Sequence, residues 1–324
     1  MCGISGLVNW GDRRTLARMN AVQVHRGPSG SGVWEHRSTD GTYVGLGNRR
    51  LSILDLSDDG QMPMSNEDGT VWITYNGEIY NFRALRRELE SKGHRFKSQT
   101  DTEVIVHLYE EEGPDCVEQL NGMFAFAICD LRGTSPLVFL ARDHFGVKPL
   151  YYACTGGRLA FASEAKALLE VPGVETEIDL EAFDQYMTFL WVPDSRTLFK
   201  GIFKMPPGHF AVFQDGEMNI SQYWDLSFPP ENHEFRFSED ALAWEVRERF
   251  RNSVEQQMVS DVPLGAFLSA GLDSSSIVAM MTTAATQPVR TYTVTFPEKY
   301  RKGENTLDDP AVAARVATTL GCEN

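Results

Sequence analysis

The sequence predicts an α+β first part, with stacked sheets covered by helices, and a smaller α/β second part with a parallel sheet. Three observations support this prediction. The first two thirds of the 324 residues hold many strand patterns and few helix patterns, which is not the order of a βαβ fold. Strand and helix patterns alternate after about residue 230, as they do in parallel sheets. A polar, Pro-containing stretch separates these regions, so we expect domains at 1–228 and 237–324 joined by a linker at 229–236.

Seven strands are expected in the first part. Met123–Cys129 is apolar without alternation, so both faces of that strand should be buried. Gly156 and Gly157 lie between two strand patterns, which is typical of a tight hairpin. In chain order the expected strands are Gly3–Asn9, Tyr43–Leu51, Val71–Glu78, Met123–Asp130, Leu137–Asp143, Leu150–Thr155 and Arg158–Ser163.

Three helices are expected in the first part, each from an apolar stripe with a helical period. The first stripe follows Asn81 and ends at Gly93, the second ends at Gly113, and the third begins after Asp179 as its N-cap. The residues expected to face inward are Phe82, Leu85 and Leu89; Val104, Ile105 and Leu108; and Leu180, Phe183 and Met187.

The sequence pattern of the second part predicts one long helix followed by two strand–helix units. The strands are expected at Leu264–Leu268 and Thr291–Phe296. The last helix has Asp309 as its cap, Pro310 at its first position and Gly321 as its terminator. The apolar stripes are Leu242, Val246, Phe250, Val254 and Met258; Ile277, Val278 and Met281; and Val312, Val316 and Leu320.

Composition and charge exclude several classes of protein. The 30 Lys and Arg against 45 Asp and Glu leave a net charge of −15, whereas binding of nucleic acid needs clustered basic side chains. No stretch approaches the roughly 18 consecutive apolar residues of a membrane span, and the N-terminus lacks a secretory pattern. Five cysteines without a C-x-x-C pair indicate a reducing cytoplasm, with Cys116, Cys129 and Cys154 as core residues.

Cys2 is the candidate nucleophile. Removal of Met1 would leave Cys2 with both a thiol and a free α-amine. An α-amine has a pKa of about 7.7–8.0, so it can accept the thiol proton at neutral pH. Nucleophile and base would then belong to one residue. Taken alone, the observation fits an ordinary Cys near a chain end equally well.

Polar residues elsewhere could complete a site for an amino-acid amide. Asn76 and the backbone N–H of Gly77 are suitable donors to an oxyanion, and Glu78 is a suitable partner for an ammonium group. Arg50 could pair with a carboxylate, and Asp101 could hold the ammonium as well. Each has a simpler alternative: a turn at Asn76, a surface charge at Arg50 and a helix cap at Asp101.

Together with further motifs, these residues resemble one family, the glutamine-hydrolysing asparagine synthetases. These are class II glutamine amidotransferases with an N-terminal-nucleophile (Ntn) hydrolase domain. The resemblance implies an αββα sandwich followed by part of an α/β domain like the adenine-nucleotide alpha hydrolases, of the N-type ATP pyrophosphatase kind. The further motifs are His25–Pro28, Asn121–Phe126, Arg142–Tyr152, Phe161–Leu168 and Met205–His209.

The resemblance implies that glutamine is hydrolysed through a thioester on the nucleophile, with release of ammonia and without a cofactor. Ser29 stands where the family usually has Asp, and we expect an altered loop contact there and no loss of hydrolysis. The catalytic residues implied are Cys2, Asn76 and Gly77, and the glutamine-binding residues are Arg50, Leu51, Ile53, Glu78 and Asp101.

A second candidate site lies at the small-residue loop Ser269–Ser275, between a strand and a helix. Free backbone N–H groups at such a turn suit a phosphate, and the loop lacks the Lys of a Walker A motif. It resembles the pyrophosphate loop of N-type ATP pyrophosphatases, which implies ATP and Mg²⁺, with Asp273 as a metal ligand. Ala270 replaces a usual Gly, at a cost of about 1 kcal/mol or more if its φ is positive. The nucleotide-binding residues implied are Leu268, Ser269, Gly271, Asp273, Ser274, Ser275 and Val294.

The family's synthetase domain extends well past two strand–helix units, so we expect a shortened synthetase. This chain should carry out the glutaminase step without making asparagine itself. Its expected partners are glutamine, ATP and aspartate, with no nucleic acid and no membrane, and the sequence leaves a homodimer open. The alternatives are an amidotransferase for another carboxylate, a stand-alone glutaminase and a non-catalytic relative. A glutaminase assay with and without ATP and aspartate separates them.

Overall fold

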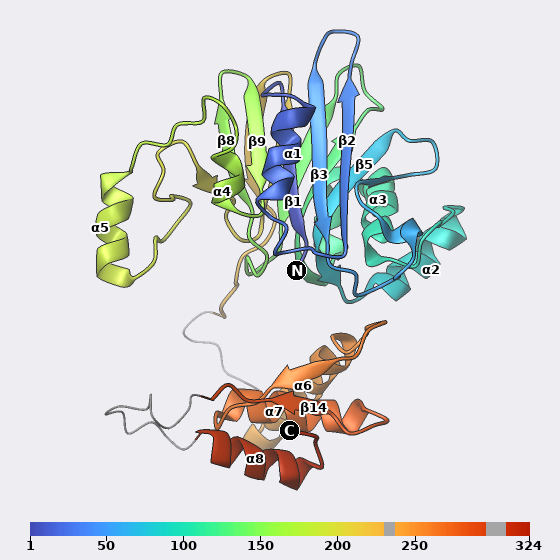
Figure 1. Ribbon diagram of the computed structural model, residues 1–324. Helices are drawn as coiled ribbons and strands as arrows, with labels where there is room; N and C mark the ends of the chain where they lie inside the picture. The colour runs from blue at the N-terminus through green and yellow to red at the C-terminus, as the bar shows by residue number, and fades with distance from the viewer. Residues whose placement is uncertain (230–236, 296–308) are drawn as a thin grey trace. The chain divides into compact units, whose positions relative to one another are not determined.

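The computed structural model describes residues 1–229, 237–295 and 309–324. These residues form two compact units, Met1–Ser227 and Phe228–Asn324 (Figure 1). The expected linker at 229–236 lies, from residue 230 onward, outside the described residues, and so does Phe296 at the end of the second expected strand. Each unit is considered by itself below.

The first unit contains two six-stranded antiparallel sheets. β1 is paired on both sides, with β3 and with β9, so it lies in the interior of its sheet. One sheet has the order β10 (Phe203–Lys204), β8 (Tyr151–Thr155), β9 (Arg158–Ala162), β1 (Gly3–Val8), β3 (Tyr43–Arg50) and β2 (Gly30–Arg37). The other has the order β12 (Glu217–Gln222), β11 (His209–Gln214), β7 (Leu137–Arg142), β6 (Gly122–Asp130), β5 (Val71–Ile79) and β4 (Met64–Ser65).

Helices cover the outer faces of both sheets (Figure 1). α1 (Arg13–Ala21) and α4 (Ala165–Leu168) contact strands of the first sheet, and α3 (Asp101–Glu112), paired with α2 (Phe82–Lys92), contacts β5 of the second. The fifth helix, α5, spans Leu180–Phe189. Two short 3-10 helices lie at Asp58–Gly60 and Gly113–Gln119. The predicted αββα arrangement is therefore confirmed.

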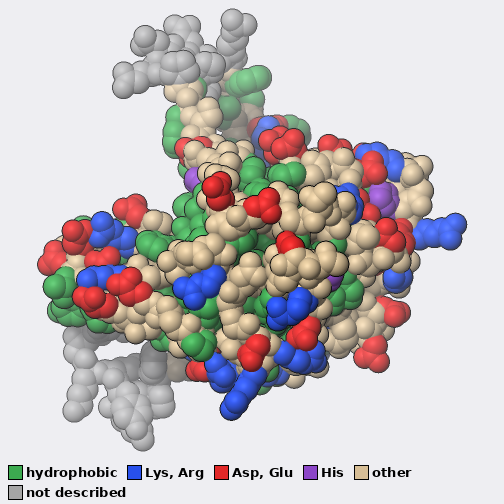
Figure 2. All heavy atoms as spheres, turned by 90° about the horizontal axis from the view of Figure 1, so that it is seen from above, with side chains coloured by type: hydrophobic (Ala, Val, Ile, Leu, Met, Phe, Trp, Pro, Cys, Tyr) green, Lys and Arg blue, Asp and Glu red, His purple; other side chains and the backbone are tan. Residues whose placement is uncertain are grey.

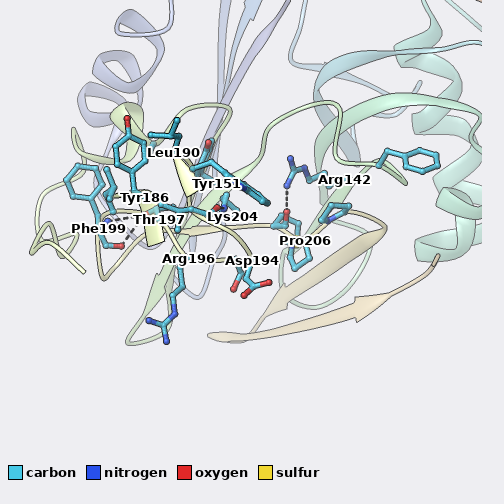
Figure 3. A pocket seen from close by; sticks show the side chains of 18 residues that line it. Arg142, Tyr151, Tyr186, Leu190, Asp194, Arg196, Thr197, Phe199, Lys204 and Pro206 are labelled. Carbon is cyan, nitrogen blue, oxygen red and sulfur yellow. Dashed lines mark hydrogen bonds between the residues drawn. The ribbon is translucent and has the colours of Figure 1, made fainter. Parts of the chain in front are cut away.

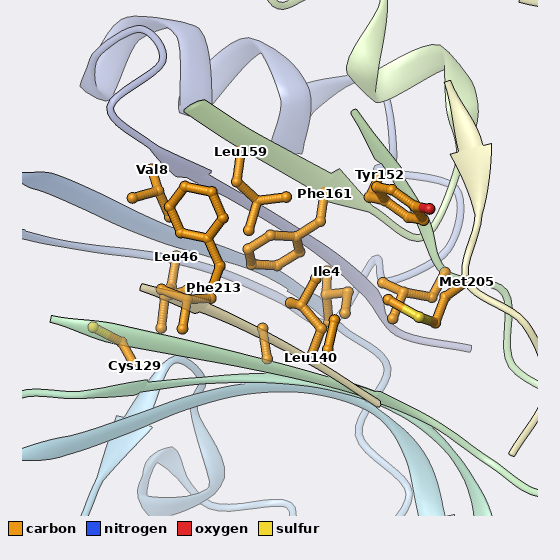
Figure 4. Close-up of a cluster of buried hydrophobic side chains, with 14 of the residues drawn as sticks. Ile4, Val8, Leu46, Cys129, Leu140, Tyr152, Leu159, Phe161, Met205 and Phe213 are labelled. Carbon is orange, nitrogen blue, oxygen red and sulfur yellow. The ribbon is translucent and has the colours of Figure 1, made fainter. Parts of the chain in front are cut away.

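The main core lies between the two sheets and is almost entirely apolar (Figure 4). Ile4 and Phe161 come from the first sheet and Leu140 and Phe213 from the second, and all four are at most 2% exposed. Gly6 is required beneath the Phe161 ring, because a Cβ there would lie 2.0 Å from the ring's Cζ atom. The packing of these layers fixes the strand ends from which the candidate site is built.

The prediction for α5 is half correct. Asp179 caps the helix as expected, accepting hydrogen bonds from the backbone N–H groups of Glu181 and Ala182. The expected inward stripe is wrong, because Leu180, Phe183 and Met187 are 75%, 47% and 63% exposed. A helical period identifies residues that share a face, but it does not say whether another element covers that face.

Several elements of the first unit were not predicted. α1 follows Asp12, whose side chain accepts a hydrogen bond from the Thr15 N–H as an N-cap. β2 and β12 are sheet edges with mixed or exposed burial, so they lack the apolar signal used for the other strands. β11 lies between β7 and β12, and its alternating burial was not predicted from the sequence.

The second unit has a small parallel sheet, as predicted. β13 (Gly265–Phe267) pairs in parallel with β14 (Arg290–Tyr292), and each strand is three residues long. Its helices are α6 (Glu239–Gln256), α7 (Leu272–Ala284) and α8 (Asp309–Leu320).

Two apolar stripes of the second unit differ from the prediction. On α8 the fully buried residues are Ala313 and Ala317, one position beyond the expected Val312 and Val316. On α6 only the C-terminal end of the stripe packs, with Val254 at 8% exposure and Val246 at 66%. On α8, the expected Val316 and Leu320 are partly buried and pack beside the two alanines.

Charged side chains of both signs lie on the surface of the protein. Figure 2 shows acidic and basic side chains interspersed over the face that it presents. Among the described residues, none of the helices has the length and apolarity needed to cross a bilayer.

Candidate active site

A cavity of about 220 Å³ in the first unit brings together all eight residues predicted to bind and hydrolyse glutamine. It lies where β1 begins, β3 and β5 approach their ends and α3 starts. The predicted residues in its lining are Cys2, Arg50, Leu51, Ile53, Asn76, Gly77, Glu78 and Asp101. The other lining residues are Met1, Leu54, Gly60, Met62, Tyr75, Thr100, Thr102, Met123 and Lys148.

Cys2 is held in place by backbone contacts from neighbouring segments. The Leu51 N–H donates to Cys2 Sγ at 3.3 Å, and Arg26 Nε donates to the Cys2 carbonyl oxygen at 2.9 Å. Burial raises the pKa of the Cys2 thiol, and the Leu51 N–H opposes that rise. Met1 also lines the cavity, and burial lowers the pKa of its α-amine. This shift belongs to the amine of Met1, whereas the candidate base is the α-amine that Cys2 would carry once Met1 is removed.

Asn76 and Gly77 form the wall contributed by β5. Asn76 is 1% exposed, and neither Oδ1 nor Nδ2 of its side chain has a hydrogen-bond partner within the described part of the chain. A buried amide without a partner costs free energy, and such unsatisfied donors are found at sites awaiting a ligand. Gly77 is opposite Phe124 in the β5–β6 register, and a Cβ on Gly77 would lie 2.4 Å from the Met123 carbonyl oxygen. A larger residue therefore does not fit at Gly77 unless the neighbouring strand shifts.

Arg50 supplies a positive charge at the other side of the cavity. Its side chain is anchored by backbone carbonyls: Nη1 donates to Ser57 at 3.1 Å, and Nη2 donates to Leu54 at 3.1 Å and to Asp55. Gly60 lets the guanidinium approach, because a Cβ at Gly60 would lie 2.1 Å from Arg50 Nη2. Among the residues that the structure describes, three of the five donors of the guanidinium are used in this way, which leaves two for a carboxylate ligand.

Glu78 and Asp101 place two carboxylates in the same cavity. Asp101 Oδ2 accepts hydrogen bonds from the Tyr75 hydroxyl at 2.7 Å and from the Ile79 N–H at 2.8 Å. Burial and the nearby Asp101 charge raise the pKa of Glu78 to about 8, and burial raises the pKa of Asp101. A bound ammonium group would favour the charged forms of both carboxylates. The cap of α3 is Thr100, whose side chain accepts from the Glu103 N–H, so Asp101 does not have the simple capping role considered above.

Lys148 is a cavity residue that the sequence analysis did not single out. It is 5% exposed, and burial lowers the pKa of its ammonium group while the charges of Glu78 and Cys2 act to raise it. The loop before it is folded around the Asp143 carboxylate, which accepts from the backbone N–H groups of Phe124, Val147 and Lys148. The only signal in the sequence was its place in the Arg142–Tyr152 motif.

Ser29 makes a hydrogen bond beside the cavity. Ser29 Oγ accepts a hydrogen bond from the Ser52 N–H at 3.3 Å, next to the cavity-lining Leu51 and Ile53. Nearby, Glu164 contacts His25 at 2.8 Å and Arg26 at 3.0 Å. Despite partial burial, hydrogen bonds from Lys166, His25 and Arg26 lower the pKa of Glu164 to about 2. This ion-pair group holds Arg26, and Arg26 in turn holds the Cys2 carbonyl.

In the second unit, the predicted phosphate loop lies between β13 and the start of α7. The Ser269 and Ser274 hydroxyls are 2.9 Å apart, and the Ser269 N–H donates to Ser274 Oγ at 3.2 Å. Ala270 is not one of the residues with positive φ, so the conditional penalty expected for it does not apply. Asp273 is exposed in the first turn of α7.

Leu268 and Val294 follow the two parallel strands of the second unit. Leu268 is 2% exposed and its N–H donates to the Tyr292 carbonyl at 2.9 Å, while Val294 is 71% exposed. Thr293 Oγ1 donates to the Leu268 carbonyl at 2.9 Å, which holds the two strand ends together. The predicted nucleotide-binding residues therefore follow the C-terminal ends of the two strands of the small sheet.

A larger cavity of about 1030 Å³ lies elsewhere in the first unit (Figure 3). Tyr186, Trp191 and Lys204 line it, and Arg142 donates to the carbonyl of Met205 beside it. It contains none of the predicted site residues. Size alone thus does not locate the chemistry, because the smaller cavity holds the nucleophile and the converging charges.

Comparison with protein families matches both units. A family described as a glutamine amidotransferase domain matches residues 1–224. A second family, asparagine synthase, matches residues 245–324.

Among curated proteins, the glutamine-hydrolyzing asparagine synthetase 1 of Bacillus subtilis (strain 168) is 40% identical over 332 aligned positions, which cover 100% of this chain and 49% of the relative. The amidase chry2 of Gibberella zeae is 32% identical over 351 positions, which cover 100% of this chain and 50% of the relative. The chain thus spans about half the length of these relatives.

A solved structure supports the fold. The glutamine phosphoribosylpyrophosphate amidotransferase of B. subtilis, complexed with ADP and GMP, matches with a TM-score of 0.50. The identity is 17%, and the match covers 95% of this chain and 69% of that chain. At this identity, the match informs the fold and not the activity.

Proposed function

Because the chain belongs to the class II glutamine amidotransferases, in the group of glutamine-hydrolysing asparagine synthetases, we propose that its first unit hydrolyses glutamine to glutamate and ammonia at Cys2. The observation that carries this proposal is the convergence in one cavity of a thiol, a buried amide without partners, a guanidinium and two carboxylates. These groups match the carboxamide, carboxylate and ammonium of free glutamine.

The first step is nucleophilic attack by the Cys2 sulfur on the side-chain carbonyl carbon of glutamine. After removal of Met1, the α-amine of Cys2 accepts the thiol proton and then passes a proton to the leaving nitrogen, so ammonia departs. A glutamyl thioester remains, and a water molecule activated by the same amine hydrolyses it to glutamate and free thiol. The hydrogen bonds from the Leu51 backbone N–H and from Arg26 Nε hold the sulfur and the Cys2 carbonyl in place during both steps.

Asn76 and Gly77 stabilise the oxyanion of each tetrahedral intermediate. Both residues line the cavity and Asn76 is 1% exposed, and a hydrogen bond to developing charge is worth more at a buried group than in solution. Arg50 binds the α-carboxylate of glutamine through the two donors that its carbonyl anchors leave free. Glu78 and Asp101 bind the α-ammonium group.

The second unit would contribute a phosphate loop to the site where ATP activates the acceptor carboxylate. The N-terminus of α7 has backbone N–H groups without intrahelical partners, and the hydroxyls of Ser269, Ser274 and Ser275 surround it. These donors fit a pyrophosphate group, and Asp273 would hold Mg²⁺ at its edge. When bound, the metal would neutralise phosphate charge. Ala270, with no positive φ, leaves the loop free of backbone strain.

We further propose aspartate as the acceptor, which would make the complete reaction glutamine-dependent asparagine synthesis. The similarity to the B. subtilis synthetase favours aspartate, whereas the similarity to the amidase chry2 makes another carboxylate the second candidate. The remaining proposals are a glutaminase domain at 1–228, a synthetase part at 237–324, cytoplasmic location, homodimer formation and no nucleic-acid partner.

The test is an assay of glutamate and ammonia release by the purified chain, with loss of Met1 verified by intact mass. Cys2→Ala should lower the rate at least about 10³-fold, because the nucleophile is lost. Cys154→Ala is the matched control, since this thiol is also partly buried but lies outside the cavity, and it should keep the rate. Equal rates for wild type and Cys2→Ala would refute the proposal.

The same assay with ATP, aspartate and detection of pyrophosphate tests the second unit. We expect no pyrophosphate release from the 324-residue chain, because the loop supplies phosphate donors and one carboxylate but no cation for the departing pyrophosphate. Pyrophosphate release that depends on aspartate would show that the synthetase site is completed in another way.

A further inference from the structure

Four side chains with metal-ligating atoms converge on the outer side of the first unit, away from the glutamine cavity. They come from three segments: Glu67 from the turn between β4 and β5, His94 from the residue after the C-cap of α2, and His107 and Glu110 from α3. One ligating atom from each lies within 4.8 Å of the corresponding atoms of all the others. None of these residues lines the cavity that holds Cys2.

The distances are close to those of a four-coordinate site. His107 Nδ1 lies 2.8 Å from Glu110 Oε2 and 3.7 Å from Glu67 Oε2, and His94 Nδ1 lies 3.8 Å from the same Glu110 oxygen. Ligands about 2.0–2.1 Å from a tetrahedral metal are about 3.4 Å from one another. Each of these three pairs is therefore within about 0.6 Å of the required spacing.

The second nitrogen of each imidazole faces another carboxylate. His94 Nε2 contacts Glu111 Oε1 at 3.0 Å, and His107 Nε2 lies 3.7 Å from Glu103 Oε1. Histidines that bind metals usually direct the other ring nitrogen to a carboxylate, which fixes the ring and the tautomer. In both rings Nδ1 faces the other ligands of the cluster, and the hydrogen bond that His107 Nδ1 makes with Glu110 Oε2 at 2.8 Å would give way to the ion.

The supporting contacts hold the ligands rigidly. Asn66 Nδ2 donates to Glu110 Oε1 at 2.8 Å, and the Arg95 N–H donates to Glu67 Oε1 at 2.9 Å. In each case one carboxylate oxygen is engaged and the other, Oε2, faces the histidines. The His107 side chain is fully buried, and its ring centroid is 4.8 Å from that of His94 and 4.6 Å from that of Phe96. The Glu67 side chain is 39% exposed, which leaves an entry path from solvent.

We propose that Glu67, His94, His107 and Glu110 form a structural site for a divalent cation of the zinc class. Two neutral imidazoles and two carboxylates carry a charge of −2, which matches one such ion. Imidazole nitrogens suit zinc, cobalt and nickel, whereas magnesium prefers oxygen ligands in octahedral geometry. The bound ion would connect α2 and α3 to the turn before β5. The same strand, β5, carries Asn76 and Gly77.

The test is a titration of the full chain, freed of metal and without a histidine tag, with Zn²⁺ in competition with a coloured chelator. The Cys2→Ala background is used throughout, because a thiol could itself bind zinc. We expect one Zn²⁺ per chain. The double substitution His94→Gln with Glu67→Gln, at partly exposed positions where folding should be kept, should weaken the affinity at least about 100-fold. His36→Gln with Glu112→Gln is the matched control outside the cluster and should leave the affinity unchanged.

A second readout identifies the coordination. Co²⁺ in place of Zn²⁺ should give the intense visible bands of a four-coordinate ion, and these bands should disappear in the His94→Gln, Glu67→Gln chain. Mg²⁺ should not compete. The proposal would be overturned by the same zinc affinity in the double and control variants, by no stoichiometric binding in the Cys2→Ala chain, or by equal binding of Mg²⁺.

Discussion

The two units of the chain differ in how deeply they bury the residues of their candidate sites. In the first unit, Arg50, Asn76 and Asp101 are at most 4% exposed; the first two belong to strands of the two six-stranded sheets, and Asp101 begins α3. In the second, the phosphate loop is largely exposed and its sheet has two strands of three residues. Phe267 and Leu272 beside that loop are 77% and 81% exposed.

The difference follows from the ligand chemistry that each site would serve. Side chains that stabilise developing charge must be held in place before the substrate arrives, which requires packed layers behind them. A phosphate loop uses backbone N–H groups at a strand–helix turn, and a single turn of regular structure is enough to orient these. One chain can therefore present a rigid site and a locally formed one.

The largest expected effect is on hydrogen exchange. Amides of β5 and β6 should exchange only on global opening, whereas amides of β13, β14 and α7 should exchange through local opening. The free energy of opening should be lower in the second unit by about 3 kcal/mol or more. Exchange followed by mass spectrometry on peptic peptides measures this difference. Equal protection of β6 and β13 would break the comparison.

Next in size is the effect of site substitutions on glutamine hydrolysis. Asn76→Ala should lower kcat about 10²–10³-fold, or about 2.7–4 kcal/mol, with a smaller change in KM. Arg50→Ala and Asp101→Ala should mainly raise KM, because they remove charge pairing to groups that do not react. Asp273→Asn, in the second unit, should leave both constants within about twofold of wild type. If Asn76→Ala changed KM alone, the assigned roles would be reversed.

A smaller difference is expected when one methyl group is added or removed. Gly6→Ala should destabilise the first unit by about 1–3 kcal/mol, because the new Cβ would meet the Phe161 ring. Phe161→Leu in the same chain should recover part of this loss, which distinguishes a clash from a backbone effect. Ala270→Gly in the second unit should change stability by less than about 0.5–1 kcal/mol, since Ala270 has no positive φ to relieve. Unfolding in urea, followed separately for each unit, measures both.

The last prediction concerns Glu78 and pH. Its pKa in the folded chain is raised to about 8 by burial and by Asp101, above the ordinary 4.5, so the folded state favours the protonated form. The contribution of Glu78 to the free energy of unfolding should therefore fall as pH rises from about 4.5 to 8 and be level above that. Glu78→Gln lacks this penalty and should be more stable by about 1–2 kcal/mol at pH 8.5, with no gain near pH 4.5. At the same time it should bind glutamine more weakly. A stability difference independent of pH would contradict the assignment.

Much of the candidate site could be predicted because its residues lie in short, ordered motifs. Four of these residues are far apart in sequence: Cys2, Arg50, Asn76 and Asp101. The resemblance of the motifs to a family predicted that they share one site, and in the structure they line one cavity. Lys148 was missed because a buried Lys looks in sequence like a surface one. Its burial depends on the loop wrapped around Asp143, and the hydrogen bonds of that carboxylate are to backbone groups that carry no sequence signal.

Strands buried on both faces could be predicted from the sequence. Elements with only one buried face were harder to predict. The fully apolar stretch of β6 identified a central strand, whereas the edge strand β2, with its half-buried residues, was not recognised. The stripe of α5 was recognised, but the inference that its apolar residues face inward was wrong. Whether a face is covered depends on the neighbouring elements, and local periodicity contains no information about them.

The position of Met1 within the lining of the glutamine cavity has a practical consequence for handling the protein. Under the mechanism proposed above, any residue that precedes Cys2 would take up space needed by the substrate's reacting group, and it would also convert the proposed base, the Cys2 α-amine, into a peptide nitrogen. Fusion partners and purification tags should therefore be placed at the C-terminus. A chain carrying an uncleaved N-terminal extension should fold around an obstructed pocket and remain inert until a peptidase exposes the cysteine.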